Sequence, residues 1–577
     1  MNGVSAPAPE LPVEDEVDEV VDDVHARGQL LHGQGSRRRP MSNQGNVKVS
    51  QQTPMMMYFG KSYIAQAALV GFWSAVAVAF LARAFLGKAE KQRQADATAF
   101  GTTFVVVTVT TFALFQRRRR ERSFSQQKKL PAEIPSSLLA AAPWGNIRGL
   151  LKVVIEWLRR RDGVARLQPP LGKPFILVNQ REALRSILVT HTNDFTKDHA
   201  FGVIETFRKT RLSDGRPAWA PVHKLASSFA RKGADKASLK LEESLARFIR
   251  RTLNASSSAG TVDLAAGLRD MYWGVTLHLV LGANPTDPHF AGSNGIYAQA
   301  WHAVIRMIES PLVNAIHLWQ YLPTPGNLFY RYACARLRRR VHAIVRADGD
   351  PAPGFTIARA LQLDSTLNDA DRLEIAMEFL FTGTVSVTSM ALMLLWHLAC
   401  EPEHQARARH SIEEGLGTLR APTLEEAGRN SFPHLERCLK ESLRLYSPIC
   451  IGRKAVRDHT LPDGRHIPAG SDVAANAWLV HHDPSVWPNP DAFDPSRFES
   501  GRESEFASGA YMPFSLGRRG CPGQPATYSI VKFLVAGILA RVELTAPSPD
   551  PPEFMPSLIL PNTPACVNVC MSALTTK

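Results

Sequence analysis

The chain has 577 residues, of which 45% are hydrophobic and 21% are charged. This composition is close to the globular average, so it excludes a chain that is disordered throughout. The formal net charge of +14 is compatible with an anionic membrane, an acidic protein partner or nucleic acid, and cannot choose among them. Because no internal repeat or mid-chain linker is found, we expect one large domain behind an N-terminal extension.

Residues 1–57 have little apolar content, an acidic beginning and a basic run at residues 37–39. This composition is typical of a disordered tail. The early acidic stretch argues against a mitochondrial transit peptide and against a secretory signal at Met1, while a start at Met41 stays open.

Two uncharged stretches follow and predict a membrane anchor over residues 58–122. The first, residues 62–82, is long enough to cross a bilayer. The second, residues 97–116, is richer in threonine, so one span or two remain open, and a buried core hairpin is the alternative for each. The arginine cluster at residues 117–122 is of the kind that stays on the cytoplasmic side, so we expect everything downstream to be cytosolic.

The segment of residues 123–145 is basic and contains several prolines, which stiffen the chain against helix formation. We expect it to be a hinge. Residues 146–577 then form the folded body.

This body is predicted to be mainly helical with small β-sheets. Apolar residues recur at helical spacing in four stretches, at residues 239–253, 371–399, 425–445 and 525–539. Strand-like pieces lie at residues 174–178 and 472–477. The second helical stretch runs on to about Cys400 and predicts a central helix of roughly 30 residues, or about 45 Å.

The seven cysteines are an odd number without the dense pairing of a disulfide scaffold, which indicates a reducing environment. No two are separated by just two residues, and Cys566 and Cys570 have no histidine nearby, so a structural zinc site is not predicted. Cys521 differs because it lies in a glycine-rich loop before a helical pattern that begins near Pro525. Loop amides and the helix N-terminus would stabilise a metal-bound thiolate there, whereas an inert buried thiol is the alternative.

This loop resembles the haem-binding pattern F-x-x-G-x-R-x-C-x-G of the cytochrome P-450 family. All five specified positions are present, as Phe514, Gly517, Arg519, Cys521 and Gly523. The resemblance covers about residues 140–577 and implies the cytochrome P-450 fold. It also implies that residues 146–577 are a catalytic domain holding haem b, with Cys521 as the axial thiolate of the iron and Arg519 beside a haem propionate.

Two further motifs resemble the same family. Glu441 and Arg444 lie three apart on a helix, and in the family such a pair joins a later arginine, here Arg497, to brace the haem-side core. Arg453 resembles an arginine that binds a propionate. Trp219 resembles the start of a W-x-x-x-R pattern at the cofactor, in which His223 replaces the usual arginine; ordinary core packing is the alternative for the tryptophan.

The central helix departs from the family. Members usually carry A/G-G-x-D/E-T, whereas residues 382–388 read TGTVSVT. We align Ser386 with the usual threonine and Val385 with the usual acid, and Thr388 is the alternative under a two-residue shift. A hydroxyl can relay protons through water and valine cannot, so Ser386 is the catalytic candidate. A hydroxyl bonded only to its own helix is the alternative.

The resemblance implies a monooxygenase that inserts one atom of dioxygen into a largely apolar lipid, steroid, terpenoid or polyketide. Electrons would come from NADPH through NADPH-cytochrome P-450 reductase. The expected location is the endoplasmic reticulum membrane, in contact with lipid, with the catalytic domain facing the cytosol and no nucleic-acid partner. Residues implied to line the pocket are Phe379, Thr382, Ile449, Cys450 and Ile451.

Two alternatives remain at this point. The missing acid at Val385 motivates a reductase-independent peroxide isomerase or dehydratase. The other alternative is a non-catalytic haem-binding membrane protein, whose signature would be a sixth, protein-derived ligand to the iron.

Overall fold

The computed structural model describes most of the chain beyond residue 130. The described residues are 130–133, 163–167, 175–196, 234–283, 296, 299–300, 302–304, 323–346, 348, 356–429, 432–448, 451–475, 477–500, 502, 509–552, 564 and 566–574. The predicted tail and anchor lie outside them, as do Trp219, His223, Ile449 and Cys450. Of the predicted hinge, only residues 130–133 are described, and they include a short strand.

The central helix, α14 (Asp369–Cys400), has the bounds that the apolar pattern predicts to within two residues. Asn368 caps its start by accepting a hydrogen bond from the Asp371 N–H, and Pro402 follows its end. It is the one helix of the described residues that is long and apolar enough to span a membrane. Its most apolar window is 78% buried, which identifies it as a core helix.

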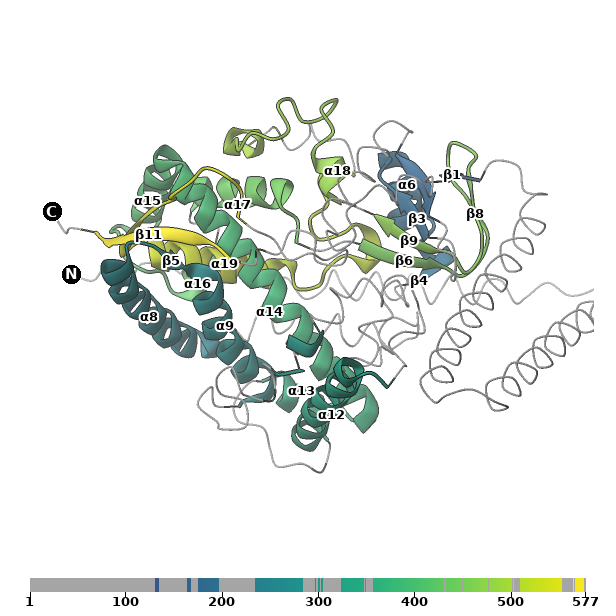
Figure 1. The fold of residues 1–577 in the computed structure, drawn as a ribbon, viewed down its shortest axis with the longest axis horizontal. Coiled ribbons are helices and arrows are strands. Elements are labelled where there is room, and N and C mark those ends of the chain that lie inside the picture. Colours follow the sequence, from purple (N-terminus) through teal and green to yellow (C-terminus); the bar gives the residue numbers. More distant parts are fainter. Residues whose placement is uncertain are drawn as a thin grey trace, which may run out of the picture. The chain divides into compact units, whose positions relative to one another are not determined.

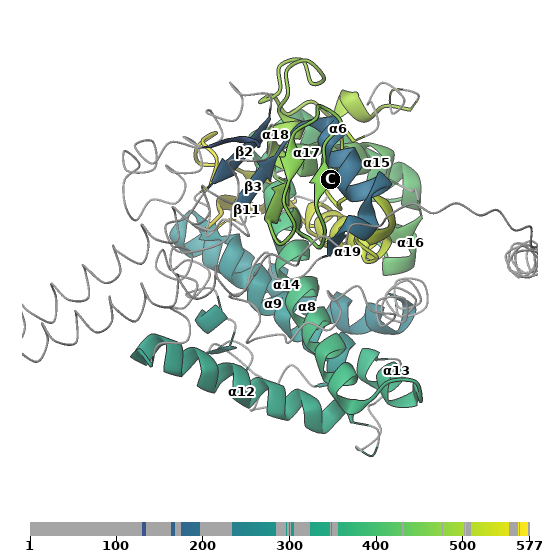
Figure 2. The ribbon, with the colours of Figure 1, turned by 90° about the vertical axis from the view of Figure 1, so that its right-hand side faces the viewer.

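Other helices pack along both halves of α14 (Figures 1 and 2). The larger of them are α9 (Leu264–Leu281), α12 (Pro325–Val345), α15 (Pro402–Leu416), α17 (Pro433–Leu445) and α19 (Gln524–Leu539). Helix α8 (Ala234–Ala259) packs on α9 and α19. One apolar cluster joins the second half of α14 to α8 and α19, and another joins its first half to α12 and the short α13 (Ile357–Leu363). The long helix therefore carries two adjoining cores.

The prediction of one helical stretch over residues 425–445 is wrong in one respect. The structure has two helices there, α16 (Leu424–Gly428) and α17 (Pro433–Leu445). Pro433 has no N–H to donate to a preceding turn, so it begins a helix at its first position and cannot continue one.

Small sheets complete the fold. The largest has the strand order β1 (Ala132–Glu133), β2 (Val164–Leu167), β3 (Phe175–Val178), β9 (Asp472–Ala475), β6 (Ile451–Ala455) and β4 (Phe195–Thr196). The others are β10 (Val542–Thr545), β11 (Asn568–Ala573) and β5 (Val262–Asp263), and the pair β7 (His459–Thr460) and β8 (His466–Ile467). The predicted strands at residues 174–178 and 472–477 are confirmed as β3 and β9, which pair in parallel.

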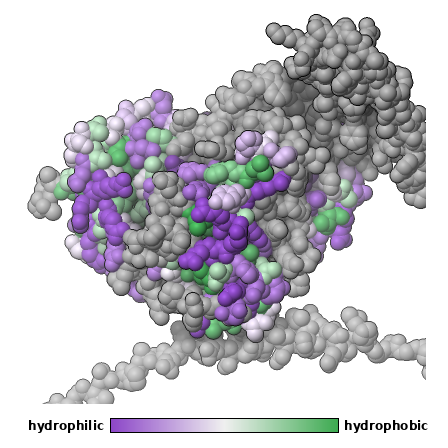
Figure 3. Space-filling view, turned by 60° about the horizontal axis from the view of Figure 1, so that its bottom comes forward, coloured by the Kyte–Doolittle hydropathy of each residue, from purple (hydrophilic) through white to green (hydrophobic). Residues whose placement is uncertain are grey.

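On the face drawn in Figure 3, hydrophilic residues predominate among those described, and hydrophobic ones form small separate groups. The six cysteines that the structure describes are all free thiols.

Candidate functional site

The loop that carries Cys521 is closed by its own backbone. The N–H of Cys521 donates to the Phe514 carbonyl at 2.9 Å, and the N–H of Gly520 donates to that of Gly517 at 2.9 Å. Cys521 is exposed, and helix α19 begins three residues later at Gln524. An accessible thiol at the positive end of a helix is the environment that favours a thiolate ligand.

The buried cysteines show the contrast. Cys334 and Cys438 are fully buried, and burial raises the pKa of each thiol to about 12. Such thiols stay protonated at neutral pH. Of these three cysteines, Cys521 is the exposed one.

Two glycines of the loop have distinct reasons to be glycine. Gly517 has a φ of +69°, and a Cβ there would lie 2.3 Å from the Leu188 carbonyl oxygen. No side chain fits at that position. At Gly523 a Cβ would lie 3.7 Å from the Cys521 sulfur, so the glycine leaves that side of the sulfur uncovered.

The two arginines that were predicted to bind the cofactor lie close together. Arg453, on β6, is 5% exposed; its guanidinium donates to the Gly452 carbonyl at 2.8 Å and to the Ser515 hydroxyl at 3.3 Å. Within the described part of the chain, no carboxylate pairs with it. Burial, and then the positive charge of Arg519, lower the pKa of Arg453 to about 10. Two neighbouring guanidiniums, one of them buried without an acid among the described residues, favour the binding of an anion.

A stripe along the middle of α14 is partly exposed, whereas the other residues between Glu374 and Ala399 are buried. It consists of Glu378, Phe379, Thr382, Gly383 and Ser386, whose spacing places them on one helix face. This face therefore borders space that solvent reaches. It contains the two residues of this helix that were implied to line the pocket, while the third described member of that set, Ile451, is 9% exposed at the start of β6.

The hydroxyls of this helix differ in their bonding. Those of Thr384 and Thr388 are buried and donate to helix carbonyls at 3.0 and 2.8 Å, and that of Thr382 donates to the Glu378 carbonyl at 2.8 Å. Ser386 makes no hydrogen bond to any residue that the structure describes, and it lies on the partly exposed stripe. Ser386 is therefore the hydroxyl that is available to a ligand or to water, which favours it over Thr388.

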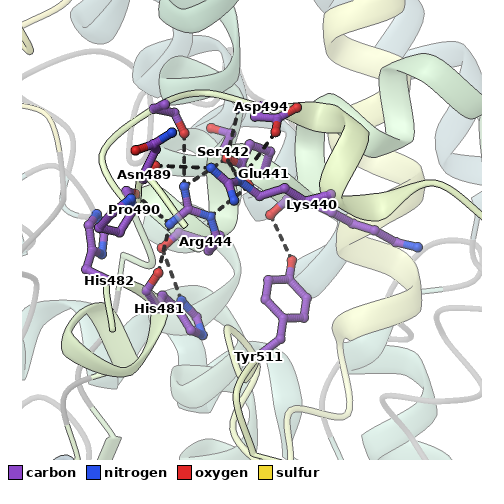
Figure 4. A network of polar contacts seen from close by, with 12 residues as sticks. Lys440, Glu441, Ser442, Arg444, His481, His482, Asn489, Pro490, Asp494 and Tyr511 are labelled. Atoms are coloured by element: carbon purple, nitrogen blue, oxygen red, sulfur yellow. Dashed lines mark hydrogen bonds and ion pairs between the residues drawn. The ribbon is translucent and has the colours of Figure 1, made fainter. Parts of the chain in front are cut away.

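A buried network joins the three predicted bracing residues, and Figure 4 shows its centre at Glu441 and Arg444. The guanidinium of Arg444 donates twice to the Glu441 carboxylate, at 2.8 Å each time, and Arg497 donates to the same carboxylate at 3.3 Å. Glu441 and Arg444 are 0% exposed. Arg444 also donates to three main-chain carbonyls, those of His481, Pro490 and Ala492, at 2.7 to 3.1 Å.

His481 connects this network to the cysteine loop. It lies at the end of α18 (Ala477–His481), its Nδ1–H donates to the Arg444 carbonyl at 3.1 Å, and its Nε2 accepts from the Met512 N–H at 2.9 Å. Burial and neighbouring positive charges lower the pKa of His481 to about 3. Its role was not foreseen, because no sequence spacing links it to either partner.

A second support lies beneath the start of the loop. The residues from Ser186 form a π-helical turn, Ser186–Thr190, and the Ser186 hydroxyl lies 3.1 Å from the Nε2 of His459. The Nδ1 of His459 lies 3.2 Å from a carboxylate oxygen of Asp194. Ser186 and His459 are buried, so this triad fixes the turn whose Leu188 carbonyl packs on Gly517.

The sequence was compared with models of protein families and with known proteins. The family model described as "Cytochrome P450" matches residues 131–569. The chain is 40% identical over 188 residues to a taurochenodeoxycholic 6 alpha-hydroxylase of Sus scrofa, covering 32% of this chain and 36% of that one. It is 33% identical over 261 residues to leukotriene-B4 omega-hydroxylase 3 of Mus musculus, covering 42% and 50%. The matched part thus spans at most half the length of these two relatives.

The fold resembles solved structures over a greater length. The haem domain of cytochrome P450DA superposes with a TM-score of 0.63 at 19% identity, covering 77% of this chain and 98% of that one. The predicted fold, mainly α with small sheets, is confirmed by this likeness and by the family match.

Proposed function

This chain belongs to the cytochrome P450 family, and from that premise we propose that it is a haem-thiolate monooxygenase acting on a largely apolar organic substrate. The family binds haem b through a cysteine thiolate. In this chain we assign that ligand to Cys521. The observation that carries the proposal is the exposed Cys521 thiol in a loop that is held between two buried polar networks.

The residues around the loop would hold the cofactor by charge. Arg453 and Arg519 supply two guanidiniums for its propionates, and the carboxylates would relieve the repulsion between them. When bound, haem supplies the redox chemistry, and a thiolate ligand favours cleavage of the O–O bond of dioxygen, which is an established property of the family.

On the opposite side, the stripe on α14 would face the substrate. Ser386 offers a hydroxyl that is not bonded to the helix and can hold a water and pass a proton to it. Val385, at the position of the usual acid, is 6% exposed within an apolar cluster and carries no proton. Protons must therefore reach Ser386 from another residue, through water or through the substrate.

For the substrate we propose a fatty-acid derivative or a steroid, chosen from the wider set of lipid, steroid, terpenoid and polyketide. Phe379 lies on the stripe, and Ile451 is an apolar residue at the start of β6, which suits an apolar ligand. Two relatives are named for acting on taurochenodeoxycholic acid and on leukotriene B4, both of which are lipids.

For partners and location we propose NADPH-cytochrome P-450 reductase and the endoplasmic reticulum membrane, with the catalytic domain facing the cytosol. The net charge of +14 suits an acidic electron donor and an anionic lipid surface. The uncharged stretches at residues 62–82 and 97–116 are the proposed anchor.

A second candidate is a peroxide isomerase or dehydratase that needs no reductase. The apolar environment of Val385 favours it, because such a reaction needs no proton delivery from an acid at this position. Product from a lipid hydroperoxide alone, without NADPH and reductase, would replace the monooxygenase proposal with this one. A non-catalytic haem protein would need a second protein ligand to the iron, opposite Cys521. The stripe on α14, which we propose faces that side, carries no imidazole or thiol.

The first experiment is the carbon monoxide difference spectrum of the reduced protein. We expect a thiolate-type, red-shifted Soret band in the wild type and its loss in Cys521→Ala. Cys570→Ala, a half-buried cysteine on β11, is the matched control and should keep the band. A red-shifted band that survives in Cys521→Ala would overturn the assignment of the ligand.

A further inference from the structure

A cluster of metal-binding side chains lies outside the site described so far. His404 comes from the first turn of α15, and His434 and Cys438 come from α17. Their nearest ligand atoms all lie within 4.8 Å of one another. The Nδ1 of His404 is 3.3 Å from the Nε2 of His434.

The geometry is that of a small coordination site. Metal–nitrogen bonds of about 2.0–2.1 Å in a tetrahedral site place two nitrogens about 3.3 Å apart. His434 and Cys438 are four residues apart, so they project from one face of α17. Cys438 is 0% exposed and His434 is 5% exposed, whereas His404 is partly exposed and gives an entry path.

The surrounding charge selects among metals. Arg407 and Arg437 act electrostatically on both His434 and Cys438. With one thiolate and two neutral imidazoles, Zn²⁺ would leave a net charge of +1 beside these arginines, whereas Cu⁺ would leave none. Thiolate and imidazole ligands accept both ions.

We propose that His404, His434 and Cys438 bind a soft closed-shell cation, with Cu⁺ preferred over Zn²⁺. On binding, the Cys438 thiol loses its proton to solvent and its sulfur bonds to the metal, with no change of oxidation state. The ion would tie α15 to α17, the helix that carries Glu441 and Arg444. Because the unfolded chain lacks the preformed site, binding also stabilises the folded state.

Without metal, His404 and His434 form a hydrogen-bonded pair, and the proton of His434 has a different position. A guanidinium nitrogen of Arg437 lies 3.5 Å from the Nδ1 of His434. If that nitrogen accepts from Arg437, the proton of His434 sits on Nε2 and points at His404. Metal binding requires a bare Nε2, so the proton must move to Nδ1 and the weak arginine contact must open.

The test uses the full, haem-loaded chain under anaerobic, reducing conditions, with Cu⁺ competed against a chromophoric chelator and Zn²⁺ in a parallel series. We expect one Cu⁺ per chain and X-ray absorption showing one sulfur and two nitrogen neighbours, with an unchanged Soret band. His404→Gln should lower the Cu⁺ affinity about 10-fold or more. His410→Gln, an exposed histidine on the same helix, is the matched control and should bind as the wild type does.

Two results would overturn the proposal. One is equal Cu⁺ affinity in the wild type and His404→Gln, and the other is bound copper without a sulfur neighbour. Tighter retention of Zn²⁺ than of Cu⁺ would overturn the assignment of Cu⁺. Because His404 is partly exposed, its variant tests the site without removing the buried Cys438, and Cys438→Ser serves as the second variant. Failure here leaves the Cys521 spectrum untouched, so the two proposals are tested separately.

Discussion

The buried network of Glu441, Arg444 and Arg497, here called the brace, and the stripe on α14 hold polar groups in opposite ways. In the brace, Glu441 and Arg444 are 0% exposed, and each oxygen of the carboxylate accepts at least one hydrogen bond. On the stripe, Ser386 is partly exposed and has no hydrogen bond within the described chain. A fully satisfied network fixes geometry, whereas an unsatisfied hydroxyl remains available to water or substrate. Substitutions in the first region should therefore cost stability, and those in the second should cost catalysis.

The largest effect is expected for Arg444→Ala. It leaves the Glu441 carboxylate buried without its main partner, so the free energy of unfolding should fall by about 3–5 kcal/mol. Chemical denaturation, followed together with haem content, measures it. Arg429→Ala is the matched control, because Arg429 pairs with Glu425 on the exposed surface, where such pairs contribute at most about 0.5 kcal/mol. Equal losses in both variants would contradict the role of the brace.

Near pH 6, a smaller and pH-dependent effect is expected at His481. Its folded-state pKa, about 3, lies below the usual 6.5, so between these values the unfolded chain takes up a proton that the folded chain does not. Stability from this residue is complete above about pH 6.5 and is lost as the pH falls toward 3, by about 1.4 kcal/mol per pH unit.

His481→Gln should remove that part of the slope. Unfolding measured at pH 8, where the histidine is neutral in both states, reports the lost hydrogen bonds alone and serves as the internal control. An unchanged slope between pH 6 and pH 4 in the variant would show that His481 already carries a proton when folded.

The smallest effect on stability is expected for Ser386→Ala, within about 0.5 kcal/mol, because it removes no hydrogen bond to the described chain. Its effect on turnover should be the clearest. A smaller fraction of the consumed NADPH should yield product, and a larger fraction should yield released hydrogen peroxide. Thr388→Val, whose hydroxyl is buried and bonded to helix carbonyls, should leave this coupling unchanged. If Thr388→Val lowered the coupling and Ser386→Ala did not, proton relay would be assigned to Thr388. The contrast drawn between the two regions would then be wrong.

The sequence predicts best what is local. The central helix, the strands at residues 174–178 and 472–477 and the cysteine loop follow from periodicity or from a contiguous motif, and the structure confirms their positions. The loop motif and the E-x-x-R pair are also local, and Arg497 was found because it lies in a recognisable segment. The break before Pro433 was missed, because apolar spacing continues across it while the backbone hydrogen bonds do not.

What the sequence did not predict depends on distant segments. His481 bonds to Arg444 and Met512, and Ser186 approaches His459, which is 273 residues further along. The cluster of His404 with His434 likewise joins two helices across a proline break. No spacing rule encodes such pairs, since they arise only when the helices and sheets pack. The functions of Trp219 and His223 remain predictions, as both lie outside the described residues.

The way in which Arg444 makes its contacts bears on how this protein can diverge. Outside Glu441, its guanidinium binds the main-chain oxygens of three residues, namely His481, Pro490 and Ala492. A carbonyl oxygen is present whatever side chain the residue carries. Random mutation of Pro490 and Ala492 therefore leaves these acceptors in place as long as the chain keeps its path. Mutational drift should be fast at Pro490 and Ala492 and nearly arrested at Arg444 itself.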